Sequence, residues 1–366
     1  MRRREFLKVT ASYLSVSPVA ALAGNVQNVS KAQPSETGST LINMDDADPG
    51  EGHKLGVGLG CMGMSEFYGP VNQAAVNRAL LAASDLGVTL LDTADMYGNG
   101  ENERLVGQTL RSHPSLRVAT KFGIVREGQN WRVDNRPDYV RSACEASLRR
   151  LGVDSIDLYY VHRINPSHPI EETIDAMVDL IRQGKIRAIG LSEAAPATIR
   201  RAHSRHPITA VETEYSLLSR EPERDVLPTC AELGIRFVPY APLSRGMLTG
   251  SAYDSTRLAE TDFRKNLPRF QPENFAFNSR LVDGLVEFAN QRGCTSSQVA
   301  LAWLLSKGPD FLPIPGCRSI RHLAENMAAP TIVLSADELS ELDRLFPIAV
   351  AAGKRYSDAE LLTVGL

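Results

Sequence analysis

The stretch LGVTLLDTADMYGNGENERLVGQTLRSHPSLRVATKFG, residues 86–123, contains one complete strand–helix–strand unit. Two short apolar runs, Thr89–Asp92 and Arg117–Thr120, flank a longer segment of helical periodicity. Short strands that alternate with longer helices are typical of βαβ units around a parallel sheet. The stretch therefore predicts an α/β fold.

The same alternation continues through the chain from Leu55 onward, with a plausible helix after each strand. Six further strands are predicted, at Val57–Leu59, Ile156–Val161, Ala188–Leu191, Ala210–Glu214, Arg236–Pro239 and Phe311–Pro313. Polar caps mark three helix starts: Asn72 before Gln73–Leu86, Asn135 before a helix with Pro137 in its first turn that runs to Leu151, and Ser335 before Ala336–Phe346.

Eight such units can form either an open doubly wound sheet or a closed barrel. An open sheet normally carries a G-x-G-x-x-G fingerprint at its first turn, and Gly56–Gly60 (GVGLG) lacks that spacing before a helix. We therefore predict a single-domain (β/α)8 TIM barrel, with its functional residues at the carboxyl ends of the strands. The long stretch Pro242–Asn278, between strand seven and the next helix, is a candidate lid.

The ends of the 366-residue chain indicate extensions around one barrel. The barrel is assigned to residues 53–346, a polar linker to 24–52 and a C-terminal tail to 347–366. In residues 1–23, Arg3-Arg4 precede a short, mildly apolar stretch that ends in Ala-Leu-Ala, which resembles a twin-arginine export signal. This stretch is too short and too polar to span a membrane. The resemblance implies the twin-arginine export machinery as a partner and a periplasmic location, or a cytoplasmic one if the signal is not used.

Composition argues against several other classes of function. The formal net charge is −3, and no cluster of Lys and Arg interleaves with aromatic residues, so nucleic acid is not an expected partner. The five cysteines are scattered, with no C-x-x-C pair and no His at ligand spacing. Neither a disulfide framework nor a metal site is predicted.

Titratable side chains follow three successive strands and should meet at one face of the barrel. Strand two runs into Asp92 and Tyr97, strand three runs into Lys121, and strand four runs into His162. A Tyr hydroxyl has an unperturbed pKa of about 10, and a nearby Lys ammonium stabilises its phenolate. Asp92 would hold that ammonium in place, and His162 can donate a hydrogen bond to a carbonyl oxygen that gains negative charge.

These four residues match the catalytic tetrad of the aldo-keto reductase family, which the chain resembles from His53 to Asp343. Further motifs in matching order are Gly58–Gly63 (GLGCMG), Gly190–Ser192 (GLS), Pro239–Gly246 (PYAPLSRG) and Ile314–Arg318 (IPGCR), followed by Glu325-Asn326. Reduction in this family transfers a hydride from nicotinamide to a carbonyl while the tyrosine supplies the proton. The resemblance therefore implies an NADP(H)-dependent oxidoreductase with Tyr97 as acid, Lys121 tuning its pKa, Asp92 holding Lys121 and His162 orienting a small carbonyl substrate.

The resemblance also implies cofactor contacts. Ser192 and Glu212 fit positions at the nicotinamide carboxamide, and Tyr240 fits the position that stacks under the ring. Arg318 would pair with the adenosine 2′-phosphate, which favours NADP(H) over NAD(H). The remaining positions that match cofactor-binding motifs are Gly60, Cys61, Met62, Leu243, Ser244, Gly246, Gly316, Glu325 and Asn326.

Three features depart from the commoner family pattern. Glu193 stands where many members have Asn, and Glu212 stands where many have Gln. An ionised Glu212 accepts hydrogen bonds but cannot donate one, which predicts a weaker grip on the carboxamide. Asp45–Lys54 is polar and irregular where family members carry a hairpin that closes the barrel floor, so the floor is either open or closed in another way.

Two functions are compatible with these residues. One is a reductase or dehydrogenase of aldehydes, ketones or sugar-like substrates, and the other is an NADP(H)-binding redox sensor or regulatory subunit with negligible turnover. Substrate specificity is expected to depend on the loops Ser65–Pro70, Val125–Trp131 and Tyr253–Phe277, with Phe67 and Trp131 as candidate walls of an apolar pocket.

Overall fold

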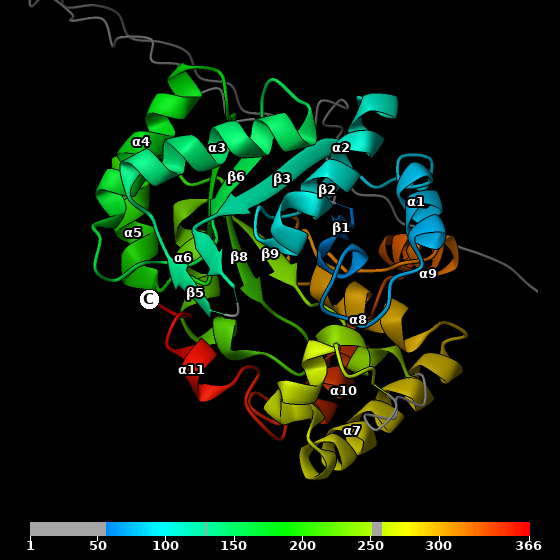
Figure 1. Ribbon diagram of the computed structural model, residues 1–366. Helices are drawn as coiled ribbons and strands as arrows, with labels where there is room; N and C mark the ends of the chain where they lie inside the picture. Colours follow the sequence, from blue (N-terminus) through cyan, green and yellow to red (C-terminus); the bar gives the residue numbers. More distant parts are fainter. Residues whose placement is uncertain (1–55, 129, 251–257) are drawn as a thin grey trace, which may run out of the picture. The chain divides into compact units, whose positions relative to one another are not determined.

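The computed structural model describes residues 56–128, 130–250 and 258–366. In this part of the chain, seven parallel strands form one sheet in the order β1-β2-β3-β6-β7-β8-β9, with helices packed around it (Figure 1). The strands are β1 Leu59–Gly60, β2 Leu90–Asp92, β3 Arg117–Phe122, β6 Leu158–Val161, β7 Ile189–Ser192, β8 Ala210–Glu214 and β9 Arg236–Tyr240. Each of them overlaps a strand predicted from the sequence.

The eighth predicted strand closes this sheet into a barrel. Residues 311–316 form bridge pairs with β9 on one side and with β1 on the other. On the β1 side, the carbonyl oxygens of Pro313 and Pro315 accept hydrogen bonds from the amides of Gly58 and Gly60, at 3.0 and 3.2 Å. Because proline has no N–H, Pro313 and Pro315 cannot donate hydrogen bonds to β1 in return. On this side of the strand, the hydrogen bonds are therefore donated only by β1. The predicted (β/α)8 barrel is confirmed, and its eighth strand is irregular for this reason.

Helices cover the outer face of the barrel (Figure 1). Their bounds are α1 Gln73–Leu81, α2 Glu101–Ser112, α3 Pro137–Leu151, α4 Ile170–Arg182, α5 Pro196–Arg205, α6 Val226–Leu233, α7 Pro272–Gln291, α8 Ser296–Leu305, α9 Ile320–Met327, α10 Ala336–Leu345 and α11 Asp358–Leu361. Among the described residues, no helix combines the length and the apolar character that a bilayer crossing requires.

Local capping explains two of the three predicted helix starts. Asn72 caps α1 and Ser335 caps α10, each by accepting a hydrogen bond from the backbone N–H of the third helical residue. The predicted cap Asn135 is wrong, because α3 has Arg136 at its N-cap. The Asn135 side chain instead accepts a hydrogen bond from the amide of Asn165, at 2.7 Å. α1 is also shorter than predicted, because the chain after it continues in tight turns.

The two-residue period of the strands separates the barrel interior from the face under the helices. Interior side chains form one apolar cluster, which consists of Leu90, Ala119, Leu158, Tyr160, Ala188, Ala210, Val238, Leu312 and Ile314. The residues between them, such as Leu91, Val118 and Val211, belong to the larger core under the helices. Further toward the carboxyl end, polar side chains lie on this face at the end of six strands or directly after it: Asp92, Lys121, His162, Ser192, Glu212 and Tyr240.

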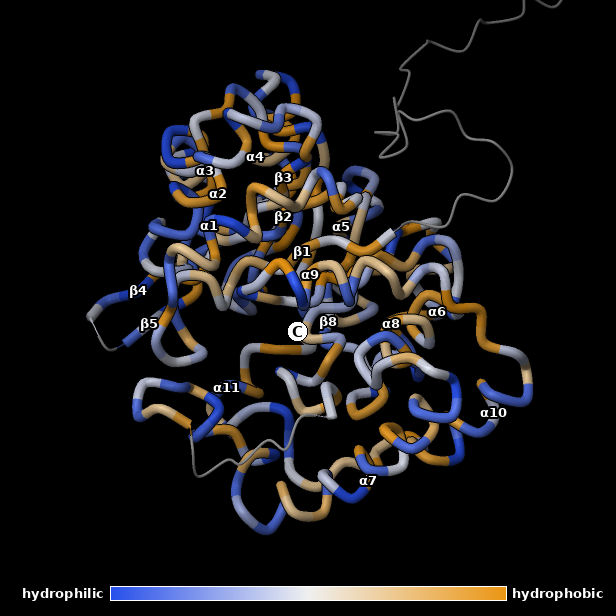
Figure 2. The backbone as a smooth tube through the Cα atoms, turned by 90° about the vertical axis from the view of Figure 1, so that its right-hand side faces the viewer, coloured by the Kyte–Doolittle hydropathy of each residue, from blue (hydrophilic) through white to orange (hydrophobic). Residues whose placement is uncertain are grey.

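One element had no counterpart among the predicted strands. An antiparallel hairpin, β4 (Ile124–Glu127) and β5 (Asn130–Val133), follows β3 and projects from the barrel (Figure 2). Arg126 on β4 donates hydrogen bonds to both carboxylate oxygens of Glu66, at 2.8 and 3.0 Å. This ion pair fastens the hairpin to the loop that follows β1.

The stretch Pro242–Asn278 is more ordered than the predicted loop. It contains 3-10 turns and the beginning of α7, and the turns lie at Ser244–Thr249, Phe263–Asn266 and Pro268–Phe270. Phe263 packs edge-on against Phe67 and Tyr68, with ring centroids 5.8 and 5.3 Å apart. The predicted extent of irregular chain is therefore wrong, but part of the stretch does lie over the barrel mouth. Residues 251–257 are outside the described part.

The C-terminal segment, residues 347–366, packs against the barrel mouth. The carbonyl oxygen of Leu366 accepts a hydrogen bond from the amide of Ala195, and the amide of Gly365 donates to the carbonyl of Glu193, both at 2.8 Å. The end of the chain therefore lies beside the connection between β7 and α5, and Figure 1 shows the C-terminus close to α5. The predicted export signal (1–23), the linker (24–52) and the predicted irregular stretch at 45–54 lie outside the described residues.

Candidate active site

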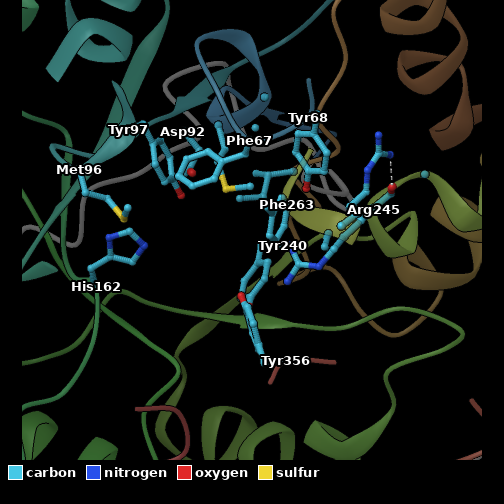
Figure 3. Close-up of a pocket in the computed structure, with 18 of the residues that line it drawn as sticks. Phe67, Tyr68, Asp92, Met96, Tyr97, His162, Tyr240, Arg245, Phe263 and Tyr356 are labelled. Atoms are coloured by element: carbon cyan, nitrogen blue, oxygen red, sulfur yellow. Dashed lines mark hydrogen bonds between the residues drawn. The ribbon is translucent and has the colours of Figure 1, made fainter. Parts of the chain in front are cut away.

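A large cavity opens at the carboxyl ends of the strands (Figure 3). Its volume is about 1480 Å³. Because a site for one small molecule typically has roughly 300–1,000 Å³, this cavity has room for a large ligand and a small one together. Phe67 and Trp131, the two predicted wall residues, line it together with Phe263.

The predicted tetrad comes together in this cavity. Lys121 on β3 forms an ion pair with Asp92 at the end of β2, and its ammonium also donates to the carbonyl of Thr93 at 3.1 Å. The Lys121 nitrogen lies 5.6 Å from the centroid of the Tyr97 ring. The Tyr97 and His162 rings meet edge to face, with centroids 5.8 Å apart (Figure 3). The four side chains predicted from the sequence therefore share one buried site.

Burial and charge together set the protonation of Tyr97. Burial raises the pKa of the Tyr97 phenol, and the Lys121 ammonium acts against that rise. Burial also opposes the charge on Lys121, but Asp92 and Glu212 outweigh it and raise the pKa of the ammonium. Tyr97 is therefore protonated and ready to donate, and a permanent positive charge lies beside it to stabilise the phenolate left behind.

His162 is held neutral. Burial lowers the pKa of its imidazole well below the ordinary value, and the nearby Arg163 and Lys121 charges lower it further. A neutral imidazole carries one N–H, which it can donate to a carbonyl oxygen. This protonation state fits the predicted role of His162 in orienting a substrate.

Glu212 adds a second carboxyl group to the site. One of its oxygens lies 3.3 Å from the Lys121 nitrogen, so a single ammonium serves both Asp92 and Glu212. Burial and the Asp92 charge raise the pKa of Glu212 to about 8. This shift favours the neutral carboxyl at neutral pH over the ionised form that the expected weaker grip assumes.

The hydroxyl of the predicted platform residue Tyr240 bonds to Glu193, Tyr356 and Arg355 above the barrel. It donates to Glu193 at 2.7 Å and lies 3.0 Å from the hydroxyl of Tyr356 (Figure 3). Arg355 donates to both oxygens of Glu193, at 2.6 Å each. Burial opposes ionisation of Glu193, but Arg355 and Arg163 outweigh it and lower the pKa of Glu193 to about 2. Glu193, like Arg355 and Tyr356, had no predicted role in the site.

The loop after β9 has an unusual backbone. Ala241, Ser244 and Arg245 all have positive φ angles, of 47°, 47° and 57°. Such conformations cost about 1–3 kcal/mol each in residues other than glycine, and they cluster at ligand sites. Leu243 and Gly246 of this loop line the cavity.

The structure places nine of the thirteen predicted cofactor residues on the cavity: Gly60, Met62, Ser192, Glu212, Tyr240, Leu243, Gly246, Gly316 and Arg318. Arg318 donates hydrogen bonds to the carbonyls of Pro70 and Tyr68, at 3.0 and 2.9 Å. Within the described part of the chain, the other four do not line it; these are Cys61, Ser244, Glu325 and Asn326. Ser244 bonds to Ser216 instead.

A closed α/β barrel whose strand ends unite a tyrosine, a lysine, an aspartate and a histidine defines an oxidoreductase that acts on carbonyl and alcohol groups. Comparison with known proteins agrees with this class. The model of the aldo/keto reductase family matches residues 55–346. The chain belongs to the aldo/keto reductase family.

Three relatives illustrate the match. Probable aldo-keto reductase 1 from Glycine max is 43% identical over 304 residues, which are 82% of this chain and 88% of that protein. A glycerol dehydrogenase from Gluconobacter oxydans has a TM-score of 0.73 and 31% identity, over 79% of this chain and 90% of that chain. An aldo-keto reductase from Klebsiella pneumoniae, solved in complex with NADPH, has a TM-score of 0.64 and 30% identity, over 81% of this chain and 96% of that chain.

Proposed function

We propose that this protein is an NADP(H)-dependent oxidoreductase of small aldehydes, ketones or sugar-like carbonyls and of the corresponding alcohols. The observation that carries the proposal is the Lys121–Asp92 pair beside a protonated Tyr97 and a neutral His162, inside a cavity of about 1480 Å³. The relative from Klebsiella pneumoniae that was solved with NADPH supports the choice of cofactor.

The residues present fit a nicotinamide cofactor. Ser192 and Glu212 are neighbours in the β7–β8 register and line the cavity together. One buried oxygen of Glu212 has no hydrogen-bond partner among the described residues, although it faces the Lys121 ammonium. The left-handed loop after β9 brings Leu243 and Gly246 to the same cavity, and both positions match cofactor-binding motifs of the family.

Four side chains can bind the substrate and transfer its proton. A bound nicotinamide supplies a hydride to the carbonyl carbon, or accepts one from the alcohol. The N–H of His162 can hold the carbonyl oxygen, and Tyr97 can transfer its proton to that oxygen as negative charge develops. Lys121 then stabilises the phenolate, and Asp92 holds Lys121 in place.

The walls of the cavity suit a small substrate with an apolar part. Phe67 and Phe263 stand on one side, and Trp131 from the β4–β5 hairpin is half-exposed at the rim. These rings can cover an apolar group while the carbonyl reaches Tyr97. One solved relative is a glycerol dehydrogenase, so polyols and their oxidised forms belong among the compounds to be tested.

Steady-state oxidation of NADPH with a panel of aldehydes and ketones tests the proposal. We expect substrate-dependent oxidation by the wild type and a loss of about 10²–10⁴-fold in Tyr97→Phe, the usual size of a general-acid contribution. Tyr215→Phe is the matched control, since it removes the same hydroxyl from a buried tyrosine that bonds Glu223 and does not line the cavity. NADPH binding without turnover in the wild type would favour a redox sensor or regulatory subunit instead.

We also propose that the protein is exported to the periplasm, on the strength of Arg3-Arg4 and the short apolar stretch that follows. Cell fractionation of the full chain, with Arg3→Lys/Arg4→Lys as the comparison, tests this location. Export of the wild type and retention of the variant are expected. Equal cytoplasmic retention of both chains would contradict the proposal.

A further inference from the structure

We propose that Glu212 works as a neutral carboxylic acid, whose proton lets it bind the nicotinamide carboxamide as a glutamine would, so that cofactor affinity falls when Glu212 ionises. This inference rests on the NADP(H)-dependent function proposed above. It reverses the expectation of a weaker grip, because a neutral carboxyl group has one O–H donor and one carbonyl acceptor. A primary amide presents the same two functions, and an ionised carboxylate presents only acceptors.

The position of Glu212 in the barrel supports this role. It lies on β8 directly beside Ser192 of β7, and it shares the interior face of the strand with Ala210. Only 3% of Glu212 is exposed, so water solvates a charge there poorly. Both Glu212 and Ser192 line the cavity, where the family resemblance places the carboxamide.

The charges around Glu212 also favour its neutral form. Asp92 from β2 and Lys121 from β3 face it directly, and Arg163, which follows β6, adds a more distant positive charge. Arg163 is occupied by hydrogen bonds to the His162 carbonyl and to the Ser192 hydroxyl. A charge on Glu212 would also raise the pKa of the Tyr97 and Tyr160 phenols, which lie nearby.

The residues paired with Glu212 on the two neighbouring strands are uncharged. Its register partners are Ser192 on β7 and Val238 on β9. With both carboxyls ionised, the buried trio of Asp92, Glu212 and Lys121 would carry one excess negative charge. One proton removes that excess, as in carboxyl pairs that share a site.

Two carboxylate oxygens in this trio lack hydrogen-bond partners in the described part of the chain. Asp92 Oδ2 and Glu212 Oε2 are both buried, and neither has a hydrogen-bond partner within the described residues. Buried polar atoms are normally paired, and two ionised carboxyls offer each other acceptors only. A proton on Glu212 turns its unpaired oxygen into a donor that can bond the carboxamide oxygen. Because Asp92 holds the direct ion pair with Lys121, Glu212 is the carboxyl that keeps the proton.

The predicted pH dependence follows from these arguments. Burial and the Asp92 charge raise the pKa of Glu212 to about 8, so the acid form prevails below that pH and is lost above it. If only the acid form binds well, the apparent Kd is the intrinsic Kd divided by the protonated fraction. The Kd for NADPH should therefore rise about 30-fold between pH 7 and pH 9.5.

Two measurements on the full chain test the proposal. The first is the Kd for NADPH, followed by its fluorescence from pH 7 to pH 9.5. The wild type should lose affinity as calculated, and Glu212→Gln should match the wild type at pH 7 and keep its affinity at pH 9.5. Glu260→Gln is the matched control, since Glu260 also lines the cavity but is largely exposed, and it should follow the wild type.

The second measurement is calorimetry of NADPH binding at pH 9 in buffers of different ionisation enthalpy, which counts protons taken up. The wild type should take up close to one proton per NADPH, and Glu212→Gln close to none. The proton count for the wild type tests the proposal even if Glu212→Gln does not fold. An affinity that is flat with pH, together with no proton uptake, would overturn the proposal while leaving the function intact. A protein that binds no NADPH at any pH would overturn the proposed function itself.

Discussion

Replacing Arg355 by Met breaks the buried ion pair that joins the C-terminal segment to the barrel. Arg355 donates to both oxygens of Glu193 at 2.6 Å, and the Glu193 side chain is 1% exposed. Arg201→Met is the matched control. Arg201 also donates to both oxygens of its partner Glu171, at 2.8 and 2.6 Å, but that pair lies on the surface.

The expected loss of folding stability follows from the pKa of Glu193, which the folded protein lowers from 4.5 to about 2 despite burial. A lowered pKa in the folded state stabilises the fold above the unfolded pKa, and this contribution disappears as the pH falls through the folded pKa. At about 1.4 kcal/mol per unit, it amounts to about 3 kcal/mol at neutral pH. Arg163 and the Glu214 amide supply part of it. The expected loss in Arg355→Met is therefore about 2–3 kcal/mol, against about 0–1 kcal/mol for an exposed pair.

Urea unfolding at pH 7 and pH 5 measures both losses. The carboxyl left behind in Arg355→Met can take up a proton at the lower pH, so its loss should shrink there. Adding Glu193→Gln to Arg355→Met should restore part of the stability, because it removes the unpaired buried charge. Equal losses in Arg355→Met and Arg201→Met at both pH values would refute the reasoning.

Three further predictions concern single positions. Lys121→Met should lower turnover by at least about 10²-fold, measured by NADPH oxidation, because the phenolate loses its stabilising charge. Gly190→Ala should cost about 1–3 kcal/mol in urea unfolding, because a β-carbon there would collide with the Tyr160 ring. For the control Gly56→Ala, no atom of the described residues lies within 4 Å of the new carbon, so this change should cost less. Trp131→Ala should raise KM for apolar aldehydes about fivefold and leave the Kd for NADPH unchanged, because the ring lines only the rim.

Local patterns predicted much of the fold. Apolar runs located the strands, and side-chain oxygens at Asn72 and Ser335 located two helix starts, because these signals act over a few residues. Asn135 failed as a cap because a more distant partner, Asn165, takes its side chain. The order of the strands then determined that Asp92 and Lys121 would meet.

The features of the site that the sequence did not predict depend mostly on contacts between distant parts of the chain. Arg355 and Glu193 are 162 residues apart, and no pattern in the C-terminal segment marks it as part of the site. The same holds for the proton on Glu212, which follows from burial and from the proximity of Asp92 rather than from the residue type. The β4–β5 hairpin was missed although its turn contains Gly128, a signal that could have located it.

The central claim is that Tyr97 donates the proton during carbonyl reduction, and single-turnover oxidation of prebound NADPH tests it most directly. Enzyme loaded with NADPH is mixed rapidly with an aldehyde that the wild type reduces, and the loss of NADPH fluorescence is followed. We predict rapid oxidation by the wild type and a rate lower by about 10²–10⁴-fold in Tyr97→Phe, with equal NADPH affinity. Oxidation by Tyr97→Phe at the wild-type rate would contradict the account.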